Sequence, residues 1–539
     1  MKHVSVLVAG GGPVGLTLAR DLAQRGVDCL LVERNPTTTR HPKMDNTNVR
    51  SMELFRHAGL EDQLRAVAVP QDHPFDVAWV TTMTGNELMR FSYRAPAEDR
   101  VHYQTVNDGA QPFAPPMRVS QAEIEPVLRK ALEAEDLAEI RFSTTLTDLQ
   151  EDPDGVTATI RDETTGRTEQ IRCQYLAGCD GGGSTVREAA GIRLDGRFSI
   201  MPRFMTHFRT DDPAARALLQ RWGMTWHYQS VHGTLIAQND VDTWTLHTRY
   251  PDNVTDGVSP EALVARFTGR EIPMETLVAN PWSPHLAVAQ SAGTARILLA
   301  GDAGHQYIPT GGYGMNTGIG DAYALGWMLA AVVRGFAGQP LLEGYKAERW
   351  PVWQRNLAAS ARHNAVRGQI AALYEDAAIH QPGPAGDAVR RDAAAKIAAI
   401  GNAENESHGI ELGYVYATSP VVATEDLLPS DDPVTYVPTT QPGARLPSLY
   451  LHDGRAVFDE LGQWFTIIAQ EDADITGLEA SAHATGIPLT VLRHDDAHAR
   501  AVWGAGILVV RPDQHVAWRG NSGPDRDTAQ RLWNRFLGR

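Results

Sequence analysis

The sequence predicts an α/β fold, and three stretches of the chain carry this prediction. A valine-rich run, His3–Ala9, leads into a glycine-rich loop and then into an apolar helical run. A second strand-like run, Ile297–Ala300, leads into an acidic turn, another glycine-rich loop and a helical run that starts near Asn316. Between them, residues 192–284 contain strand-length runs rich in aromatic and β-branched residues, which is typical of a separate sheet.

Composition limits the kinds of protein that this chain can be. Its 539 residues predict roughly three or four domain-sized units, and 42% hydrophobic and 21% charged residues are ordinary for globular proteins. The formal net charge of −16 argues against nucleic acid or an anionic membrane as the main partner. No apolar run reaches about 18 residues, and the three cysteines have no metal-ligand spacing. We therefore expect a cytoplasmic protein without a membrane span, a metal site or a disulfide framework.

The first glycine-rich loop has the spacing of a dinucleotide-binding motif. Gly10, Gly12 and Gly15 follow the strand in a G-x-G-x-x-G pattern, and Pro13 stands where it can open the helix. A second strand ends at Glu33, about 20 residues beyond the glycines, where a carboxylate can bond the hydroxyls of an adenosine ribose. This unit predicts a nucleotide site, but it does not by itself separate FAD from NAD.

Two further stretches supply polar residues that could face the same ligand. Lys43 could reach a pyrophosphate and Asp45 lies in a polar segment, although a solvated charge and a loop acid are the simpler interpretations from the sequence alone. Arg118 and Gln121 flank Ser120, which has the position of a helix N-cap. These two residues either face the cofactor or simply mark the start of a helix.

A third glycine-rich stretch, Gly178–Arg187, also follows a strand and contains Asp180. A structural turn is an alternative interpretation for this stretch alone. Ordinary packing explains most aromatic residues of the expected sheet, and the wall of a pocket for an aromatic ligand is the sharper alternative. The residues concerned are Trp226, His227, Tyr228, Trp244 and Tyr250.

Taken in order, four stretches resemble the class A flavoprotein monooxygenases, which are single-component aromatic hydroxylases that bind FAD and use NAD(P)H. These stretches are GGGPVG with Glu33, the Arg118–Gln121 helix start, Gly178–Arg187 and Gly301–Gly318. The resemblance covers about the first 370 residues by the order of motifs. It implies a Rossmann-like FAD-binding domain of the glutathione-reductase type (1–70, 112–190 and 285–400, with trailing helices). A substrate-binding β-sheet domain (71–111 and 191–284) would be inserted into it.

The resemblance also implies a role for each matching residue. Asp45 would act as the base toward a phenol, and Pro309 would line the border between substrate and flavin. Asp302 would bond the ribityl chain, and Asp180 would belong to a motif linked to both FAD and pyridine nucleotide. The implied FAD contacts are Gly10, Gly12, Pro13, Val14, Gly15, Glu33, Arg34, Lys43, Arg118, Gln121, Asp180, Asp302, Pro309, Gly314, Met315 and Asn316. Tyr313 departs from the family, which commonly has Gln there, so flavin contacts are expected to differ at this position.

The last part of the chain, 401–539, looks like a thioredoxin-like domain by the order of its expected elements. Strands are expected at Gln463–Ala469 and Leu489–Leu492, a hairpin at Gly506–Arg519, and helices at Gly477–Thr485 and Asp527–Leu537. No cysteine follows Cys179, so this domain cannot exchange disulfides. Packing, oligomer formation and shielding of the active site are the roles left to it.

The implied function is an FAD-dependent, NAD(P)H-consuming monooxygenase that hydroxylates a phenolic or polycyclic aromatic substrate through a flavin hydroperoxide. The expected partners are a small aromatic substrate and dioxygen, with a homodimer as the candidate assembly. Two alternatives stay open. One is another FAD oxidoreductase on the same fold, such as an epoxidase or a dehydrogenase, and the other is a non-catalytic protein that binds flavin or an aromatic ligand. Simple phenols, phenylpropionates and polycyclic polyketides fit the sequence equally well.

Overall fold

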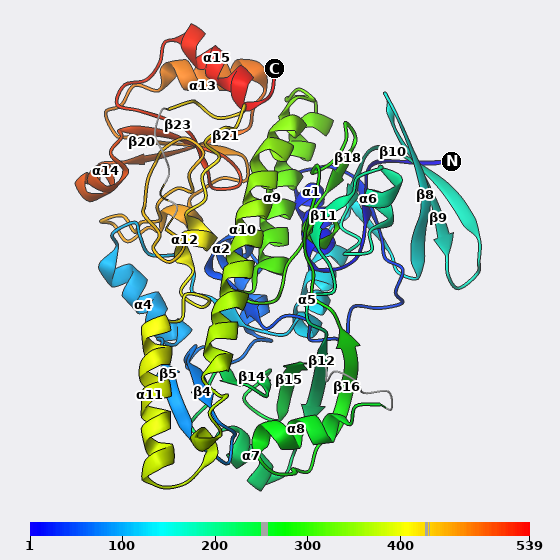
Figure 1. Cartoon of the computed structure of the whole chain (residues 1–539). Helices are drawn as coiled ribbons and strands as arrows, with labels where there is room; N and C mark the ends of the chain where they lie inside the picture. Colours follow the sequence, from blue (N-terminus) through cyan, green and yellow to red (C-terminus); the bar gives the residue numbers. More distant parts are fainter. Residues whose placement is uncertain (250–256, 426–429, 431) are drawn as a thin grey trace.

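A mostly parallel sheet forms the first part of the chain, shown as a computed structural model in Figure 1. The structure describes residues 1–249, 257–425, 430 and 432–539. The strands of this sheet are β1 (Lys2–Ala9), β2 (Cys29–Val32), β7 (Ala138–Arg141), β8 (Thr144–Asp152), β9 (Gly155–Asp162), β10 (Thr168–Gly178) and β18 (Ile297–Leu299). Their order is β7-β2-β1-β10-β9-β8, with β18 paired to β10. The pairs among β7, β2, β1, β10 and β18 are parallel, whereas β8 and β9 form an antiparallel hairpin.

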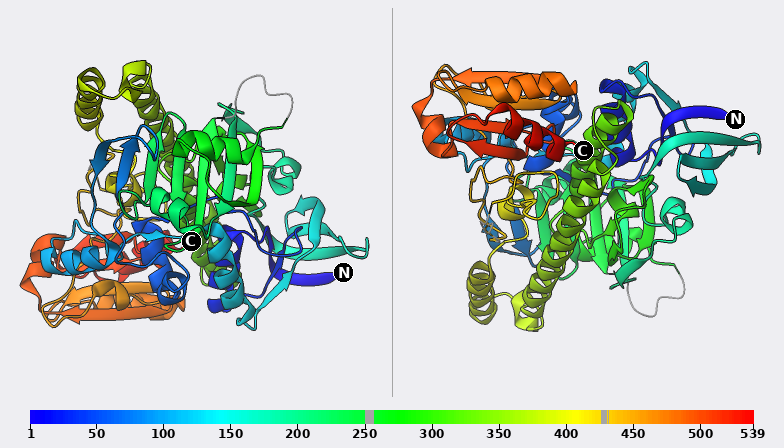
Figure 2. Two further views of the ribbon diagram at one scale, coloured as in Figure 1. Left: turned by 90° about the horizontal axis from the view of Figure 1, so that it is seen from below. Right: turned by 90° about the horizontal axis from the view of Figure 1, so that it is seen from above.

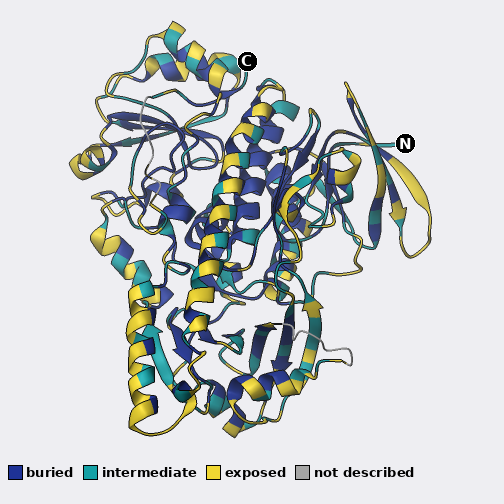
Figure 3. Cartoon of the chain, in the orientation of Figure 1, coloured by how far each residue is buried: buried dark blue, intermediate teal, exposed yellow. Residues whose placement is uncertain are grey.

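Three helices lie against this sheet and bring its two glycine-rich loops together. Helix α1 (Pro13–Gln24) packs against both α5 (Gln121–Glu133) and α9 (Tyr313–Val333). Helix α9 is buried along most of its length, which is why it has almost no polar side (Figure 3). Because α1 and α9 both begin at a glycine-rich loop, their packing places the two loops side by side.

A second sheet combines strands from two separate parts of the sequence. They are β4 (Val77–Val80), β5 (Glu87–Phe91), β12 (Arg203–Arg209), β13 (His227–Ser230), β14 (Gly233–Ala237), β15 (Thr243–Arg249) and β16 (Glu275–Trp282). Their order is β16-β12-β15-β14-β13-β4-β5. One face packs on α7 (Pro213–Leu219) and α8 (Pro260–Thr268) through a core that includes Tyr228 and Trp244, as the packing interpretation predicted. Tyr250 lies outside the described residues.

Two smaller sheets join these parts. Strand β3 (Asn46–Thr47) pairs with β6 (Met117–Arg118), and β17 (Leu286–Ala289) pairs with both β11 (Leu194–Arg197) and β19 (His305–Gln306). The long helix α10 (Leu341–Ala372) packs on α9 and continues to the second sheet (Figure 1). The alanine-rich run 357–380 predicts a helix, but α10 begins earlier, at Leu341, and ends earlier, at Ala372. It contains Pro351, a residue that usually ends a helix.

The C-terminal part forms a four-stranded sheet with helices. Its strands β20 (Phe465–Gln470), β21 (Leu489–His494), β22 (Ile507–Val510) and β23 (Val516–Gly520) follow the order β21-β20-β22-β23. With α13 (Thr476–Thr485) and α15 (Arg526–Phe536), they confirm the strands, hairpin and helices expected from the sequence. Helix α14 (Ala497–Trp503) was not expected, and Asp496 caps it by accepting from the amide of Ala499 at 2.9 Å.

The C-terminal part is joined to the first part by both apolar and ionic contacts. Phe465 packs edge-on against Trp327 of α9, and the fully buried Arg511 donates to Glu348 of α10 and to Asp513. From above, the C-terminal sheet and the β8–β9 hairpin lie on opposite sides of α10 (Figure 2). None of the described helices has the length and hydropathy that crossing a membrane requires.

Candidate functional site

The first glycine-rich loop is shaped by two close backbone approaches. A Cβ at Gly10, which has φ of +106°, would lie 2.2 Å from the carbonyl oxygen of Cys179, and one at Gly15 would lie 2.0 Å from the carbonyl oxygen of Gly10. In contrast, a Cβ at Gly12 would meet nothing closer than 4.0 Å. The loop is therefore packed behind and open in front, at the N-terminus of α1, where amides without intrahelical partners can receive an anion.

Glu33 closes the other side of this loop. Its Oε2 accepts from the amide of Gly11 at 2.7 Å and its Oε1 from the amide of Asn35 at 2.8 Å, while Arg34 is exposed. Pro13 is the first residue of α1. Val14 packs beneath the second glycine-rich loop, because a Cβ at Gly301 would come within 3.0 Å of its Cγ2. The predicted contacts of Glu33, Arg34 and Val14 with a nucleotide stay predictions.

Lys43 and Gln121 lie on the next wall of the site. Lys43 is exposed and has φ of +37°, a left-handed conformation that is uncommon for a residue with a side chain. The backbone amide of Gln121 donates to the carbonyl of Pro42 at 3.1 Å, so the start of α5 supports the turn that presents Lys43. The Gln121 side chain donates to Glu125 at 2.7 Å.

Arg118 makes contacts that the sequence did not suggest. Its guanidinium is buried and donates to the backbone carbonyls of Pro74 (3.2 Å), Met224 (3.4 Å) and Thr225 (3.3 Å). It therefore ties β6 to the segment that leads into β13. A contact between Arg118 and FAD stays a prediction.

Asp180 supports the start of a short helix, whose N-cap is Ser184. One oxygen accepts from the Ser184 hydroxyl and the other from the amide of Val186 at 3.1 Å, at the start of α6 (Thr185–Ala189). Burial raises the pKa of Asp180, and these hydrogen bonds lower it in part. Arg187 donates to the carbonyls of Gly182 and Ala303, which links α6 to the second glycine-rich loop.

The second glycine-rich loop is supported by a buried polar cluster that sequence reasoning missed. Asp321 on α9 accepts from the amide of Gly301 (3.0 Å), His305 (2.8 Å), Arg349 (2.7 Å) and Trp353 (2.9 Å). Burial raises the pKa of Asp321, but Arg349 and His305 lower it by more, to about 2. His305, a loop histidine in the sequence, thus fixes the turn η1 (Gly301–Ala303), which carries the exposed Asp302. Sequence offered no signal for this cluster, because its members come from different elements.

The rest of this loop leads to the first turn of α9. Pro309 is exposed, and the amide of Gly311 donates to Glu404, which Arg367 of α10 holds through two bonds of 2.6 and 2.7 Å. Asn316 is buried and donates to the carbonyl of Asn46 at 3.1 Å, so β3 lies directly against the loop. Gly314 and Met315 are partly exposed at the N-terminus of the helix.

Tyr313 does not occupy the exposed side of this turn. It is 2% exposed, and its hydroxyl forms a hydrogen bond of 2.9 Å with Nε2 of His363 on α10. The ring also lies against Gly311, where a Cβ would come within 2.4 Å of it. Tyr313 is therefore part of the packing between the loop and α10.

Asp45 is placed where β3 meets the polar face of the second sheet. Its Oδ2 accepts from Trp226 Nε1 at 2.8 Å and from His227 Nε2 at 2.7 Å. Burial raises the pKa of Asp45, but the charge and hydrogen bond of His227 and the hydrogen bond of Trp226 lower it by more, so the net pKa lies below its usual value. Packing was therefore an incomplete interpretation of Trp226 and His227, because both also bind an acid far away in the sequence.

Buried polar atoms without partners gather around this acid. Pairing across the strands puts His227 and Gln229 of β13 on the same face as His247 of β15. Buried polar groups usually have partners, so a cluster of exceptions indicates a surface made to receive a ligand. Within the described residues, the unpartnered atoms here are His41 Nδ1, Asn46 Oδ1, His227 Nδ1, Gln229 Nε2, His247 Nδ1 and Trp282 Nε1.

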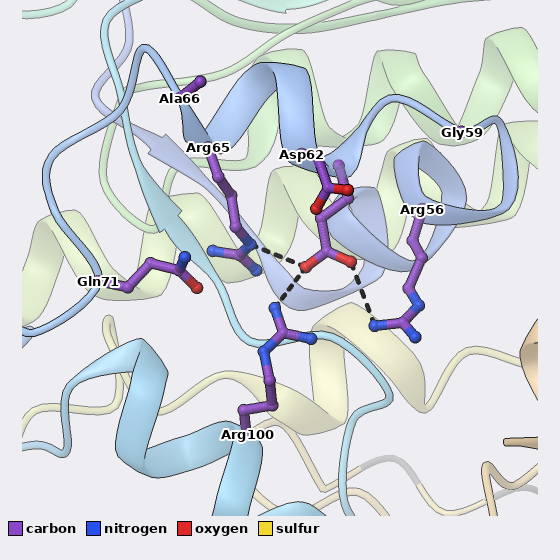
Figure 4. A pocket seen from close by; sticks show the side chains of 8 residues that line it. Arg56, Gly59, Asp62, Arg65, Ala66, Gln71 and Arg100 are labelled. Carbon is purple, nitrogen blue, oxygen red and sulfur yellow. Dashed lines mark hydrogen bonds and ion pairs between the residues drawn. The ribbon is translucent and has the colours of Figure 1, made fainter.

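A separate cavity of about 630 Å³ lies beside α2 (Val49–His57), α3 (Glu61–Arg65) and α4 (Pro96–Val106) (Figure 4). Arg56, Arg65 and Arg100 all donate to the carboxylate of Glu61 there. Asp62 in the lining and Asp459, which pairs with Arg56, bring the number of carboxylates to three, equal to the number of arginines. No residue of the predicted site lines this cavity. We therefore place the functional site between the two glycine-rich loops and the face of the second sheet.

Comparisons with known proteins identify the family of this chain. The family model described as "FAD binding domain" matches residues 3–360, and the model "Aromatic-ring hydroxylase, C-terminal" matches residues 439–539. The FAD-dependent monooxygenase apdD of Emericella nidulans is 36% identical over 561 residues, which cover 98% of this chain and 89% of that protein.

Two solved structures are similar over the whole chain. The rebeccamycin biosynthetic enzyme RebC with reduced flavin has a TM-score of 0.89 and 31% identity, covering 100% of this chain and 99% of that one. Aklavinone-11 hydroxylase, in a ternary complex with FAD and aklavinone, has a TM-score of 0.82 and 25% identity, with full coverage of both chains. The chain therefore belongs to the FAD-binding aromatic-ring hydroxylases, that is, to the class A flavoprotein monooxygenases.

Proposed function

We propose that this protein uses NAD(P)H and dioxygen to hydroxylate a phenolic or polycyclic aromatic ring. The observation that carries the proposal is the position of Asp45. The strand directly after it contacts α9 through Asn46 and Asn316, and its carboxylate contacts the second sheet through Trp226 and His227. One acid thus lies at the junction between the predicted flavin loop and the predicted substrate surface.

The residues present fit FAD. The open front of Gly12 and the N-terminus of α1 suit the pyrophosphate, and Glu33 suits the adenosine ribose. Asp302 would accept from the ribityl hydroxyls, and the first amides of α9, at Gly314 and Met315, would face the pyrimidine edge of the ring system. Bound FAD would supply hydride acceptance from NAD(P)H and the activation of dioxygen.

The residues of the chain would prepare the substrate for this chemistry. Asp45 would accept the proton of a substrate hydroxyl, which raises the electron density of the ring. Pro309, exposed on the loop before α9, would separate the substrate from the flavin, and the surrounding walls would keep water out. No step needs a disulfide or a metal ion.

A substrate panel with product analysis tests this proposal. Phenol, 3-(3-hydroxyphenyl)propionate, 1-naphthol and 1,8-dihydroxyanthraquinone are each added to the FAD-loaded protein with NADH or NADPH and isotopically labelled dioxygen. We expect coupled incorporation of one labelled oxygen atom into at least one compound. Oxidation of NAD(P)H without labelled product would indicate another FAD oxidoreductase, and the absence of ligand-stimulated oxidation would indicate a non-catalytic binding protein.

The arrangement of domains is part of the same proposal. We propose that residues 1–70, 112–190 and 285–400 act as a Rossmann-like FAD domain and that 71–111 and 191–284 form the substrate domain. The unit 401–539 would be a thioredoxin-like domain that packs against them. A cytoplasmic location and a homodimer complete the proposal, and light scattering on the FAD-loaded protein would test the dimer.

A further inference from the structure

The Asp45 carboxylate is held at only one of its two oxygens. Both hydrogen bonds, from Trp226 Nε1 and His227 Nε2, go to Oδ2, and no group in the described part of the chain donates to Oδ1. The side chain of Asp45 is 22% exposed, compared with 8% for His227. Oδ1 is therefore the atom of this group that a ligand can reach.

The state of His227 follows from its contact with Asp45. An ionised carboxylate can only accept hydrogen bonds, so Nε2 of His227 carries the proton in this contact. In a neutral imidazole the lone pair then lies on Nδ1, which is buried and has no partner among the described residues. Because Nε2 is engaged by Asp45, the protonated nitrogen of His227 acts on a ligand through the carboxylate rather than directly.

The backbone on both sides of this contact is fixed by one strand. Strand β6 pairs with β3 immediately after Asp45, and the amide of Val119 donates to the carbonyl of Asp45 at 3.1 Å. Arg118 of the same strand binds the carbonyls of Met224 and Thr225, just before Trp226. The acid and its two donors are thus held in a common frame.

We propose that Trp226 and His227 are positioning residues that turn Oδ1 of Asp45 toward the substrate hydroxyl, with Arg118 holding the segment that carries them. The inference deepens, and rests on, the proposed hydroxylase function. As the substrate's O–H bond breaks, Oδ1 forms a new O–H bond with the proton, and the bonding electron pair stays on the substrate oxygen. The product of this step is an anionic ring that is more reactive toward an electrophilic oxygen.

Three titratable or charged groups face Asp45, namely His227, His247 and Arg118. Burial lowers the pKa of His247 to about 4, so this residue is neutral near pH 7 and cannot replace the contribution of His227. Arg118 is directed at backbone carbonyls. Removing a donor to Oδ2 should therefore raise the pKa of Asp45 without compensation from its neighbours.

A titration of the Asp45 carboxyl tests the inference without turnover. Carbon-13 NMR follows the labelled aspartate carboxyls of the FAD-loaded protein against pH, and the Asp45 resonance is the one missing in Asp45→Asn. We expect its pKa to rise by about one to two units in Trp226→Phe and in His227→Leu, the size of a lost charge-assisted hydrogen bond. His227→Gln, whose amide can still donate, should recover part of the shift.

Tyr228→Phe is the matched control, because Tyr228 lies next to His227 on β13 and its hydroxyl donates to the carbonyl of Gly223 instead of to Asp45. We expect no change in the Asp45 titration in this variant. An Asp45 pKa that stays at the wild-type value in both Trp226→Phe and His227→Leu would overturn the inference. Bound FAD shows whether each variant folds. If one variant does not fold, the Asp45 titration in the other variant decides the test.

A compound that the wild type hydroxylates adds a second measurement. The acid limb of the kcat/KM profile should move to higher pH in the same variants and by the same amount. If the pKa of Asp45 rises in the variants but no compound is hydroxylated by the wild type, the proposed function is wrong and the positioning role of Trp226 and His227 stands. If the variants still hydroxylate the compound, and neither the acid limb nor the Asp45 resonance moves, the proposed function stands and the positioning role of Trp226 and His227 is wrong.

Discussion

Asp45 and Glu53 lie in the same short stretch of the chain, yet their carboxylates have opposite surroundings. Both oxygens of Glu53 are occupied, because Arg445 bridges them, Arg50 donates to one and the amide of Phe113 to the other. Asp45 has two donors, a tryptophan and a histidine, on one oxygen and none among the described residues on the other. Glu53 is fully buried, whereas the Asp45 side chain is 22% exposed.

The difference separates a charge that holds the structure together from a charge that is available to a ligand. Two arginines around Glu53 compensate its desolvation permanently and link α2 to the C-terminal part of the chain. Trp226 and His227 orient the Asp45 carboxylate through Oδ2 and leave Oδ1 available. Burial alone therefore does not indicate a functional acid. The number of free oxygens and the kind of donor are the better guides.

The largest effect is expected from breaking the buried ion pair between Arg445 and Glu53. Arg445→Ala leaves Glu53 buried with less of its charge balanced, which should lower the free energy of unfolding by about 3–5 kcal/mol. Thermal unfolding followed by circular dichroism measures this. Arg209→Ala removes an exposed pair with Glu275 and should leave the Tm unchanged. Equal losses in both variants would mean that the buried pair has no special importance.

The second effect concerns activity rather than stability. Asp45→Asn keeps a side-chain oxygen that can accept from Trp226 but removes the proton acceptor. Coupled hydroxylation should fall by about 100-fold or more, while the Tm stays within a few degrees of wild type. Product formation at saturating NAD(P)H measures the loss. Unchanged coupled turnover would remove the base role of Asp45.

A third acid, Glu411 on α12 (His408–Leu412), tests whether pairing with arginine is what distinguishes Glu53 from Asp45. Ser407 donates to it at 2.8 Å, and no arginine or lysine among the described residues pairs with it. Burial raises its pKa to about 7. The pKa of Glu411 in the folded protein lies above its value in the unfolded chain. The contribution of Glu411 to the free energy of unfolding is therefore fully present below about pH 4.5 and is lost as the pH rises through about 7.

Glu411→Gln should therefore gain stability relative to wild type as the pH rises. We expect the two proteins to differ by about 1–3 kcal/mol more at pH 8 than at pH 4.5, with the gain in favour of the variant. Urea unfolding at the two pH values measures it. A difference that is independent of pH would mean that Glu411 titrates normally in the folded protein.

The smallest effect is expected at Tyr313. Tyr313→Phe removes the hydrogen bond to His363 and should cost about 0.5–1.5 kcal/mol of stability. Because the ring is packed away from the exposed side of the loop, FAD affinity should change less than twofold. Fluorescence titration with FAD measures the affinity. A large loss of affinity would place the hydroxyl at the flavin after all.

Local patterns made much of the fold predictable. The spacing of Gly10, Gly12 and Gly15 marks the turn, because Gly15 lies directly against the carbonyl of Gly10. Aromatic and β-branched residues likewise favour strands along β12 and β15. Helix α4 was not predicted because Pro96, which usually interrupts a helix, stands at its first position. The Glu98 carboxylate accepts from the amide of Ala95 at 3.0 Å and so supports this start.

The partners within the site were not predictable from the sequence. Asp45 is far in the chain from Trp226 and His227, and aromatic residues on a strand usually indicate packing, which is also part of what Trp226 does. The cluster of His305, Asp321 and Arg349 likewise joins a loop to two helices. A motif marks where the chain turns, but only the packing of distant elements decides which side chains meet.

The length of helix α10 limits which insertions the chain can accept. At about 1.5 Å per residue, its 32 residues form a rod. This rod contacts the second glycine-rich loop through Trp353, α9 through Arg349 and the second sheet through Arg367. One residue inserted between these contacts would rotate everything beyond it by about 100°. The number of residues between Arg349 and Arg367 is therefore fixed by the two surfaces that α10 contacts.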